Sequence, residues 1–471
     1  MTGTVGAVGA FVLTAGMVAE VTGGRIASGS PDAAFSSVSI DSRTLAPGAL
    51  FVALQGVRDG EQFAGAALDR GAAGLLLSKA PQVQMPPLIA AIVVPDTLAA
   101  LQALGREVRR RSGARVVAIT GSTGKTTTKE MIAHLLATRL RVYRSRGNFN
   151  NHIGLPLSLT DLTSAPDVAV VELGMNHAGE IRRLVEIAEP DVRVWTNVGD
   201  AHIGHFGSRE AVAAAKAELL DWPTPGMVVV ANADDALIMA HVSAAGVSAV
   251  TFGTSAGATV RLTAIGDRGL DGGRARLETP AGPIDLDLAL PGRVQLANAA
   301  AASAVALHFD VPPADIAARV ASLRPLPRRG AQVMLANGAR LVDDSYNASP
   351  EAMTAMVEAL GRTRTEGRRI AVLGEMLELG SFARERHEAC GRAAARAGVD
   401  VLVVIGGAPA DGLVEGAAAG GLPRACMHRF PDAALAANEV AALIRPGDLV
   451  LVKGSRGTHT DLVADRLGAA A

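Results

Sequence analysis

The chain has 471 residues and a formal net charge of -1, from 45 basic and 46 acidic side chains. Its length predicts about three domains rather than a single core. The balanced charge gives no support for nucleic acid or an anionic membrane as the main partner. The only cysteines, Cys390 and Cys426, have no CxxC partner, so no disulfide framework is expected. The N-terminus lacks a basic segment and no long apolar run suggests a membrane span, so we expect a cytoplasmic protein.

The first hundred or so residues predict a small α/β domain, which we place at 1–112. Asp96 can cap a helix that runs to Arg111, and a polar break follows it. Ser42 and Arg43 lie in a turn after a strand and can be simple turn residues. They can equally hold an anionic ligand, because the arginine guanidinium can donate two parallel hydrogen bonds to a phosphate. Strand and helix patterns alternate along this region, at 11–21, 37–43, 50–54, 65–71 and 75–77.

A phosphate-binding loop is predicted next. The apolar run 116–120 is typical of a buried strand, and a helical pattern begins at Thr127. Between them lies the glycine-bearing loop Gly121-Ser122-Thr123-Gly124-Lys125-Thr126. Glycines and a helix N-terminus turn backbone N–H groups toward an anion, while the lysine reaches the phosphates and the final threonine can ligate Mg²⁺. Ile119 stands where the general pattern has its first glycine, so an ordinary strand-turn-helix corner is the alternative.

Three further polar residues follow in the region 113–325, which we predict to be one ATP-binding domain. Glu172 lies near the carboxyl end of the strand pattern 168–174. A carboxylate at this position can complete a Mg²⁺ shell, or it can simply be solvated. His202 comes just past the strand 192–197, and on spacing alone it is more often a packed or surface histidine. Lys216 lies in a helix, where an exposed lysine is the ordinary expectation.

The rest of the chain continues the alternation of strands and helices. Strands at 227–232 and 249–252 precede hairpin-like sequence at 257–290 and an alanine-rich helix at 294–309 that carries Asn298. A Pro- and Arg-rich segment, 323–330, marks a boundary before the predicted domain 326–471. Four strands there alternate with helices and predict a parallel, Rossmann-like sheet. Polar residues follow three of them and predict a ligand site, at Asp344, Glu375 and Lys453-Gly454-Ser455-Arg456.

The sequence resembles the Mur ligases of peptidoglycan synthesis over nearly its whole length. The motifs that carry this resemblance are TGSTGKTTTKEM, GNFNNHIGLPLSL, ELGMNHAGEI, AHIGHFGS, AKAELL, DDSYNASPEAM, GEMLELG and LVKGSRG. Within the family they are most similar to the members that join D-alanyl-D-alanine to UDP-N-acetylmuramoyl-tripeptide. The segment DSRTLAPGALFVAL resembles the UDP-binding domain of such enzymes. The resemblance implies an ADP-forming amide ligase that uses ATP and Mg²⁺ and forms an acyl phosphate. We expect the protein to act as a monomer, without nucleic acid or membrane insertion.

The resemblance also implies roles for individual residues. Lys125 is similar to the family's γ-phosphate lysine, Thr126 and Glu172 to its first Mg²⁺ shell, and His202 to its second-metal histidine. Lys216 is similar to a lysine that becomes carbamylated and then orders a metal site. The implied nucleotide-binding residues are Gly121, Ser122, Thr123, Gly124, Lys125, Thr126, Thr127, Asn298, Arg329 and Asp344. The implied substrate-binding residues are Ser42, Arg43, Asn150, Asn151, Asn176, His177, Tyr346, Asn347, Lys453 and Arg456.

Two positions depart from the family pattern, and two other functions stay open. The family's Pro-Gly-Arg appears as Pro327-Arg328-Arg329, so either arginine can be the ATP contact, and His205 stands where a small residue is usual. A folylpolyglutamate synthase-like ligase is the nearest alternative. A nucleotide-dependent switch is the alternative from another class, because 197–200 superficially resembles a guanine-reading motif but lacks its lysine.

Overall fold

The computed structural model describes residues 9–56 and 59–469. They form two compact units, and each is described by itself. The first contains the chain up to Thr120 with 139–194 and 218–228, and the second contains 121–138, 195–217 and the chain from Val229 onward. In the part of the chain that the structure describes, every helix is too short or too polar to cross a membrane. The sequence-based expectation about the N-terminal segment rests partly on residues 1–8. These residues lie outside the described residues.

The N-terminal sheet has five strands in the order β2-β7-β6-β5-β4. Strands β4 to β7 pair in parallel and β2 runs antiparallel to β7. Asp96 accepts hydrogen bonds from the first N–H groups of α3, which confirms the predicted cap. The elements are β2 (Arg25–Ser28), β4 (Val38–Ser39), β5 (Leu50–Val52), β6 (Gly74–Leu77), β7 (Ala90–Val93), α2 (Ala64–Asp69) and α3 (Thr97–Ser112).

The first helix begins later than the sequence pattern predicts. Residues Leu13–Thr14 form β1, which pairs with β3 (Ala34–Phe35), and α1 spans Ala15–Thr22 rather than 11–21. The hydroxyl of Thr14 accepts a hydrogen bond from the N–H of Met17 at 3.3 Å. This cap ends the extended segment and starts the helix.

The central sheet has nine strands in the order β16-β15-β14-β13-β12-β11-β8-β10-β9. Strand β10 lies parallel to β8, with Glu172 opposite Ile119. The predicted hairpin region forms the antiparallel strands β14, β15 and β16. The strands are β8 (Arg115–Thr120), β9 (Val142–Arg144), β10 (Val168–Glu172), β11 (Val192–Trp195), β12 (Val228–Asn232), β13 (Ala249–Gly253), β14 (Val260–Asp267), β15 (Gly273–Glu278) and β16 (Ile284–Leu288).

The phosphate-loop helix α4 begins at Lys125, two residues before the predicted start. Lys125 and Thr126 therefore belong to the first helical turn, where backbone N–H groups have no intrahelical acceptor. The helices of this region are α4 (Lys125–Leu136), α5 (Gly154–Leu159), α6 (Glu180–Ala188), α7 (Ile203–Phe206), α8 (Arg209–Ala217), α9 (Ala236–Ala244), α10 (Val294–His308) and α11 (Pro313–Ser322).

The C-terminal sheet has the order β17-β18-β22-β19-β20-β21 and is parallel except for β17. This confirms the predicted Rossmann-like arrangement and the α/β class. The strands are β17 (Ala331–Met334), β18 (Arg340–Asp344), β19 (Arg369–Gly374), β20 (Val401–Ile405), β21 (Met427–Phe430) and β22 (Leu449–Lys453). The helices are α12 (Pro350–Arg362), α13 (Ala383–Arg396), α14 (Asp411–Ala419), α15 (Ala433–Leu443) and α16 (Asp461–Gly468).

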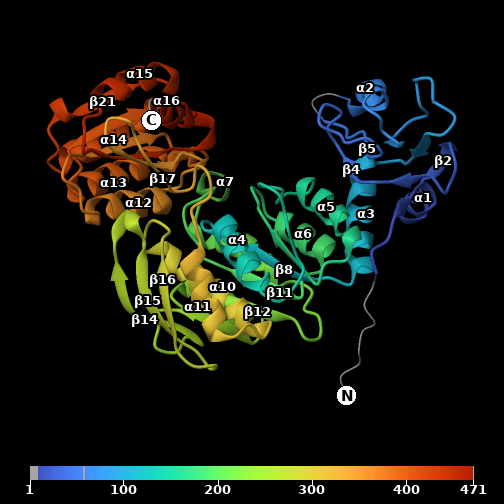
Figure 1. Cartoon of the computed structure of the whole chain (residues 1–471), viewed down its shortest axis with the longest axis horizontal. Coiled ribbons are helices and arrows are strands. Elements are labelled where there is room, and N and C mark those ends of the chain that lie inside the picture. The colour runs from blue at the N-terminus through green and yellow to red at the C-terminus, as the bar shows by residue number, and fades with distance from the viewer. Residues whose placement is uncertain (1–8, 57–58, 470–471) are drawn as a thin grey trace. The chain divides into compact units, whose positions relative to one another are not determined.

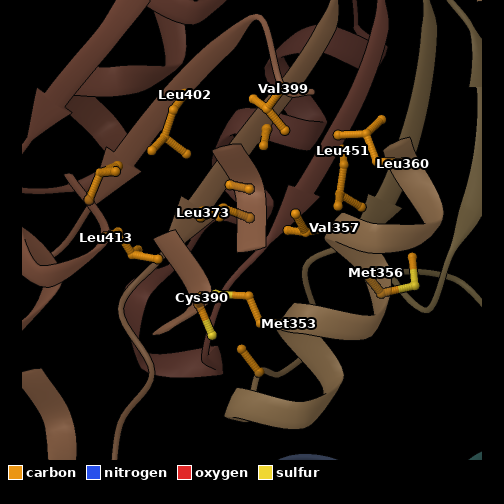
Figure 2. Close-up of a cluster of buried hydrophobic side chains, with 14 of the residues drawn as sticks. Met353, Met356, Val357, Leu360, Leu373, Cys390, Val399, Leu402, Leu413 and Leu451 are labelled. Carbon is orange, nitrogen blue, oxygen red and sulfur yellow. The ribbon is translucent and has the colours of Figure 1, made fainter. Parts of the chain in front are cut away.

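Helices cover both faces of this sheet. Helices α12, α13 and α14 pack on one face and α15 and α16 on the other (Figure 1). Alternate strand residues enter the two cores, so Leu373 and Leu451 meet Met353 and Cys390 in one cluster (Figure 2) while Val372 and Val450 face the other. Burial on both faces explains the continuous apolar strand sequences.

Candidate active site

Two glycines let the phosphate loop pass close to its neighbours. Gly121 has φ +150°, and a Cβ there would lie 2.0 Å from Oγ1 of Thr196. Gly124 has φ +81°, and a Cβ there would lie 2.6 Å from Oδ1 of Asn298. Both positions therefore require glycine for space as well as for backbone conformation. The loop places Asn298, the predicted adenine contact, directly beside the start of α4.

Asn197 holds the loop in this shape. Its Oδ1 accepts a hydrogen bond from Thr123 N at 2.9 Å, and its Nδ2 donates to Thr123 O at 3.1 Å. Ser122 is fixed in the same way, because Gly199 N donates to its Oγ at 2.9 Å. Both polar atoms of the Asn197 side-chain amide are thus hydrogen-bonded to the backbone of the loop. Sequence reasoning considered this residue only as part of a guanine-reading motif, and the contact speaks against that alternative.

Lys125 and Lys216 lie near each other in the second unit. Nζ of Lys125 donates to Gly121 O at 2.6 Å. Lys216 is only 1% exposed, so the sequence-based expectation of an exposed helical lysine is wrong. Burial, and after it the positive charge of Lys125, lower the pKa of Lys216 well below its usual value. Both effects favour the neutral form of the Lys216 amine.

His202 follows β11 and makes a contact that sequence reasoning missed. Its Nδ1 lies 2.5 Å from Oε2 of Glu378, which belongs to the GEMLELG motif. The close approach of His202 holds the pKa of the Glu378 carboxyl below its usual value, against the opposing effect of burial. His205 is exposed in the following helix α7, and its charge also lowers the pKa of the Glu378 carboxyl.

In the first unit, Glu172 and the asparagines lie around the carboxyl end of β10. Glu172 is buried. Gly174 N donates to Asn150 O at 2.7 Å, and a Cβ on Gly174 would lie 2.8 Å from Cγ of Asn150. Asn151 accepts hydrogen bonds from the N–H groups of Ile153 and Gly154 at the start of α5. Asn150 is thus brought within two residues of the end of the strand that carries Glu172.

A second turn follows in the same unit. The N–H groups of Asn176 and His177 donate to Oε2 of Glu180 at 2.6 and 3.2 Å.

The predicted ligand residues Ser42 and Arg43 differ in their surroundings. Ser42 is buried, whereas Arg43 is exposed and donates two side-chain hydrogen bonds to the carboxylate of Asp41. This hydrogen bonding to Arg43 lowers the pKa of Asp41 to about 2.

Six of the predicted residues come together at the ends of β18 and β22. Lys453 Nζ lies 2.5 Å from Oδ2 of Asp344 and donates to Asn347 O at 3.0 Å. The guanidinium carbon of Arg329 lies 3.9 Å from the centroid of the Tyr346 ring. The guanidinium carbon of Arg456 lies 6.0 Å from the same centroid.

The neighbouring Arg328 is occupied elsewhere. It forms ion pairs with Asp461 at 2.8 Å and Asp465 at 2.9 Å, on helix α16. The structure therefore favours Arg329 as the arginine that faces the polar cluster. Glu375 also adjoins the 453–456 segment, because Ser455 N donates to its backbone O at 3.2 Å. Its side chain accepts a hydrogen bond from Gly407 N at 2.6 Å and lines a cleft of about 390 Å³.

The donor types fit Mg²⁺. Thr126 supplies a hydroxyl and Glu172 a buried carboxylate, which are the hard oxygen donors that this ion prefers. Within the described ranges, no group of three His, Cys, Asp or Glu side chains forms a cage for a metal ion. Mg²⁺ does not need such a cage, because it is commonly bound through one or two carboxylates, substrate phosphates and water.

The strand, glycine loop and helix, followed by a Rossmann-like sheet with charged strand ends, define an α/β protein of the phosphate-loop nucleotide-binding class. Models of three Mur ligase segments match the chain: the family's catalytic domain at 34–122, its middle domain at 119–306 and its glutamate ligase domain at 328–456. The chain belongs to the Mur ligase family, as the sequence resemblance predicted.

Named relatives match almost the whole chain. The UDP-N-acetylmuramoyl-tripeptide–D-alanyl-D-alanine ligase of Mycobacterium tuberculosis is 36% identical over 500 aligned residues, with 97% of each chain covered. The Escherichia coli protein of the same name is 38% identical, with 80% of this chain and 82% of that protein covered.

Solved structures of proteins named MurF are similar to this chain over most of its length. A MurF structure from Acinetobacter baumannii has a TM-score of 0.87 at 30% identity and covers 97% of this chain and 99% of its own. MurF ligase from Thermotoga maritima, in complex with ADP, has a TM-score of 0.79 at 30% identity, covering 92% of this chain and 97% of its own. A folylpolyglutamate synthase of M. tuberculosis, 16% identical with a TM-score of 0.59, shares the fold alone.

Proposed function

We propose that this chain is an ATP-dependent, ADP-forming ligase that joins D-alanyl-D-alanine to UDP-N-acetylmuramoyl-tripeptide in peptidoglycan precursor synthesis. The observation that carries the proposal is the match to proteins named for this reaction over 97% of both chains. The phosphate loop supports it, because two glycines, a lysine and a helix N-terminus form a cradle for the phosphates of ATP.

The reaction has two steps. The terminal carboxylate of the tripeptide attacks the γ-phosphorus of ATP, an acyl phosphate forms and ADP leaves. The amino group of the dipeptide then attacks the acyl carbon, phosphate leaves, and the amine loses a proton as the amide forms. Phosphoryl transfer depends mainly on alignment and charge neutralisation. Lys125 and the N–H groups of the first turn of α4 supply fixed positive charge to the γ-phosphate.

Thr126, Glu172, His202 and Lys216 are the residues that would hold metal ions. Bound Mg²⁺ would neutralise charge on the phosphates during transfer. A neutral, buried Lys216 amine can add carbon dioxide and become a carbamate, whose oxygens are metal ligands. The low pKa of this amine supports the modification, because only the unprotonated nitrogen is nucleophilic.

The remaining assignments concern the nucleotide and the two substrates. Asn298 lies beside Gly124, where it can contact the base, and Arg329 and Asp344 supply contacts from the C-terminal sheet. We assign the muramoyl-peptide or dipeptide to residues that lie near strand ends and turns. These are Ser42, Arg43, Asn150, Asn151, Asn176, His177, Tyr346, Asn347, Lys453 and Arg456. The proposed domains are 1–112, 113–325 and 326–471, and we propose a monomer in the cytoplasm, where ATP and UDP-linked precursors are available.

The test measures phosphate release from ATP and Mg²⁺ with UDP-muramoyl-tripeptide, with and without D-alanyl-D-alanine. We expect release that requires both substrates and a UDP-muramoyl-pentapeptide product by mass spectrometry. Background release with both substrates would overturn the substrate assignment. Release that depends on a folyl acceptor and glutamate would instead favour the folylpolyglutamate synthase-like alternative.

A further inference from the structure

The segment Glu375–Gly380, called the 375–380 loop below, is firmly anchored in the C-terminal sheet region. Met376 N donates to Nε2 of the buried His387 at 2.8 Å. Leu377 N donates to Oγ of Ser455 at 3.0 Å. These bonds fix the backbone just before Glu378.

The far end of the loop touches the turn that carries His202. Gly204 N donates to Glu378 O at 3.1 Å. A Cβ on Gly204 would lie 2.6 Å from Gly380 N and 2.7 Å from Glu378 O. The two backbones therefore meet with no space for a side chain between them. All of these residues belong to the second compact unit.

Both residues at the centre of this contact have left-handed backbone conformations. Glu378 has φ +64° and His202 has φ +65°. This conformation costs a residue other than glycine about 1–2 kcal/mol. Such residues persist where the surrounding contacts determine them, and they cluster at functional sites. Two of them facing each other make this contact a candidate for a functional role.

The side chains complete the contact. Oε2 of Glu378 and Nδ1 of His202 lie 2.5 Å apart, and they approach as an ion pair rather than as a linear hydrogen bond. A carboxylate at this nitrogen orients the imidazole and favours a proton on Nδ1, which leaves the lone pair on Nε2. His202 can then use Nε2 toward the reaction site.

We infer that Glu378 is a positioning residue for the ligase reaction, which acts by fixing the imidazole of His202 from the C-terminal part of the chain. The inference rests on the proposed function, because that proposal assigns His202 to the site. The anchored 375–380 loop gives the carboxylate a defined position, so the orientation of His202 depends on contact with the C-terminal sheet region.

The kinetic test compares Glu378→Ala and Glu378→Gln with Glu439→Gln, an exposed glutamate on α15. We expect Glu378→Ala to lower kcat/KM about 10- to 100-fold, the usual loss when the partner of a ligating histidine is removed, and Glu439→Gln to have no effect. In a His202→Ala background, Glu378→Ala should cause no further loss. Equal losses in both backgrounds would overturn the inference, because they would mean that Glu378 acts independently of His202.

A second measurement needs no nucleotide or substrate. Proteins labelled with ¹⁵N-histidine give imidazole nitrogen resonances, and His202→Ala identifies the signals of His202 among the ten histidines. We expect Glu378→Gln, which keeps the side-chain shape, to move the Nδ1 and Nε2 resonances of His202. Unchanged resonances would overturn the inference.

The two measurements separate this inference from the proposed function. If the unmodified chain released no phosphate in response to the dipeptide, the proposed function would fail, and the resonances of His202 would still decide whether Glu378 positions it. If Glu378→Ala did not fold, the kinetic comparison would use Glu378→Gln against Glu439→Gln.

Discussion

Lys453 and Asp344 form an ion pair of 2.5 Å between the ends of two adjacent strands, β22 and β18. The lysine is 4% exposed and the aspartate side chain 15%. Burial raises the pKa of Asp344, and the charge of Lys453 acts in the opposite direction. Asp344 therefore has a structural partner in addition to the ATP contact proposed for it, so its loss affects folding as well as turnover.

Asp344→Asn should destabilise the protein, because it leaves the buried ammonium group of Lys453 without a charged partner. We expect the free energy of unfolding, measured with urea, to fall by about 3 kcal/mol. Asp411→Asn is the control, since its ion pair with Arg429 is exposed and should contribute less than about 1 kcal/mol. An unchanged urea midpoint for Asp344→Asn would show that the buried pair does not contribute to stability.

Gly124→Ala should weaken ATP binding by displacing Asn298. The new methyl group would lie 2.6 Å from Oδ1 of Asn298, a side chain that is 3% exposed and bonded to Gln295. Gly226 has the same φ of +81°, and a Cβ there would have no atom within 4 Å. Gly226→Ala therefore tests backbone conformation alone.

We expect titration calorimetry with a non-hydrolysable ATP analogue to show at least about tenfold weaker binding for Gly124→Ala, equivalent to about 1.4 kcal/mol. Gly226→Ala should bind like the unmodified protein. Equal affinities for the two variants would contradict the placement of Asn298 beside the nucleotide.

Lys125→Ala should remove charge stabilisation at the γ-phosphate. We expect turnover to fall at least about 100- to 1,000-fold, the usual effect of losing one preorganised donor to developing charge. Lys79→Ala is the control, because Lys79 is 60% exposed and pairs only loosely with Asp59, at 3.6 Å. Near-normal turnover of Lys125→Ala in the phosphate-release assay would disprove the assignment of the phosphate loop.

Lys216 should carry a carbamate when carbon dioxide is present. Desolvation and the charge of Lys125 favour the neutral form of its buried amine, and the neutral form reacts with ¹³C-labelled carbon dioxide in equilibrium with bicarbonate. We expect one protein-bound carbamate resonance in the ¹³C spectrum. It should disappear in Lys216→Ala and persist in Lys79→Ala. A carbamate signal that survives Lys216→Ala would place the modification on another amine.

The sequence predicted the elements whose pattern is strong and local. The phosphate-loop strand, the cap at Asp96 and the apolar strands of the C-terminal sheet were all visible, because burial on both faces requires continuous apolar runs. Strand β7 was missed: Ala90-Ala91 has low strand propensity, and the sheet, not the local sequence, makes this segment extended.

The site was predictable as a set of residue types but not as a set of contacts. Helical periodicity did not show that Lys216 is buried, since its neighbours are small alanines that suit either environment. Arg328 and Arg329 could not be distinguished from the sequence, and only the tertiary contacts direct one to α16 and the other to Tyr346. Glu378 was hidden for the same reason, because it meets His202 across 176 residues of sequence (378 − 202).

Asp448 gives a prediction about stability and pH. It is 2% exposed, and its carboxylate accepts hydrogen bonds from Nη2 of Arg368 at 2.6 Å and from Arg445 N at 2.7 Å. Burial alone would raise the pKa of Asp448, but these bonds outweigh burial and hold it below the usual 3.8. The folded state therefore binds this proton more weakly than the unfolded state, so the carboxylate stabilises the fold above about pH 4. This stabilisation is lost as the pH falls through the lowered pKa.

Asp448→Asn should consequently lower the free energy of unfolding most at neutral pH. We expect its free energy of unfolding to lie about 2–4 kcal/mol below that of the unmodified protein at pH 7. The difference should shrink as the pH falls below about 4 and through the lowered pKa, because Asp448 then becomes protonated and loses its charge. Asp285→Asn is the control, since its side chain is 78% exposed and its pair with Arg276 lies at the surface. Urea unfolding between pH 3 and pH 7 measures both variants. A difference for Asp448→Asn that stays constant or grows toward pH 3 would mean that the lost stability comes from packing rather than from the charge of the carboxylate.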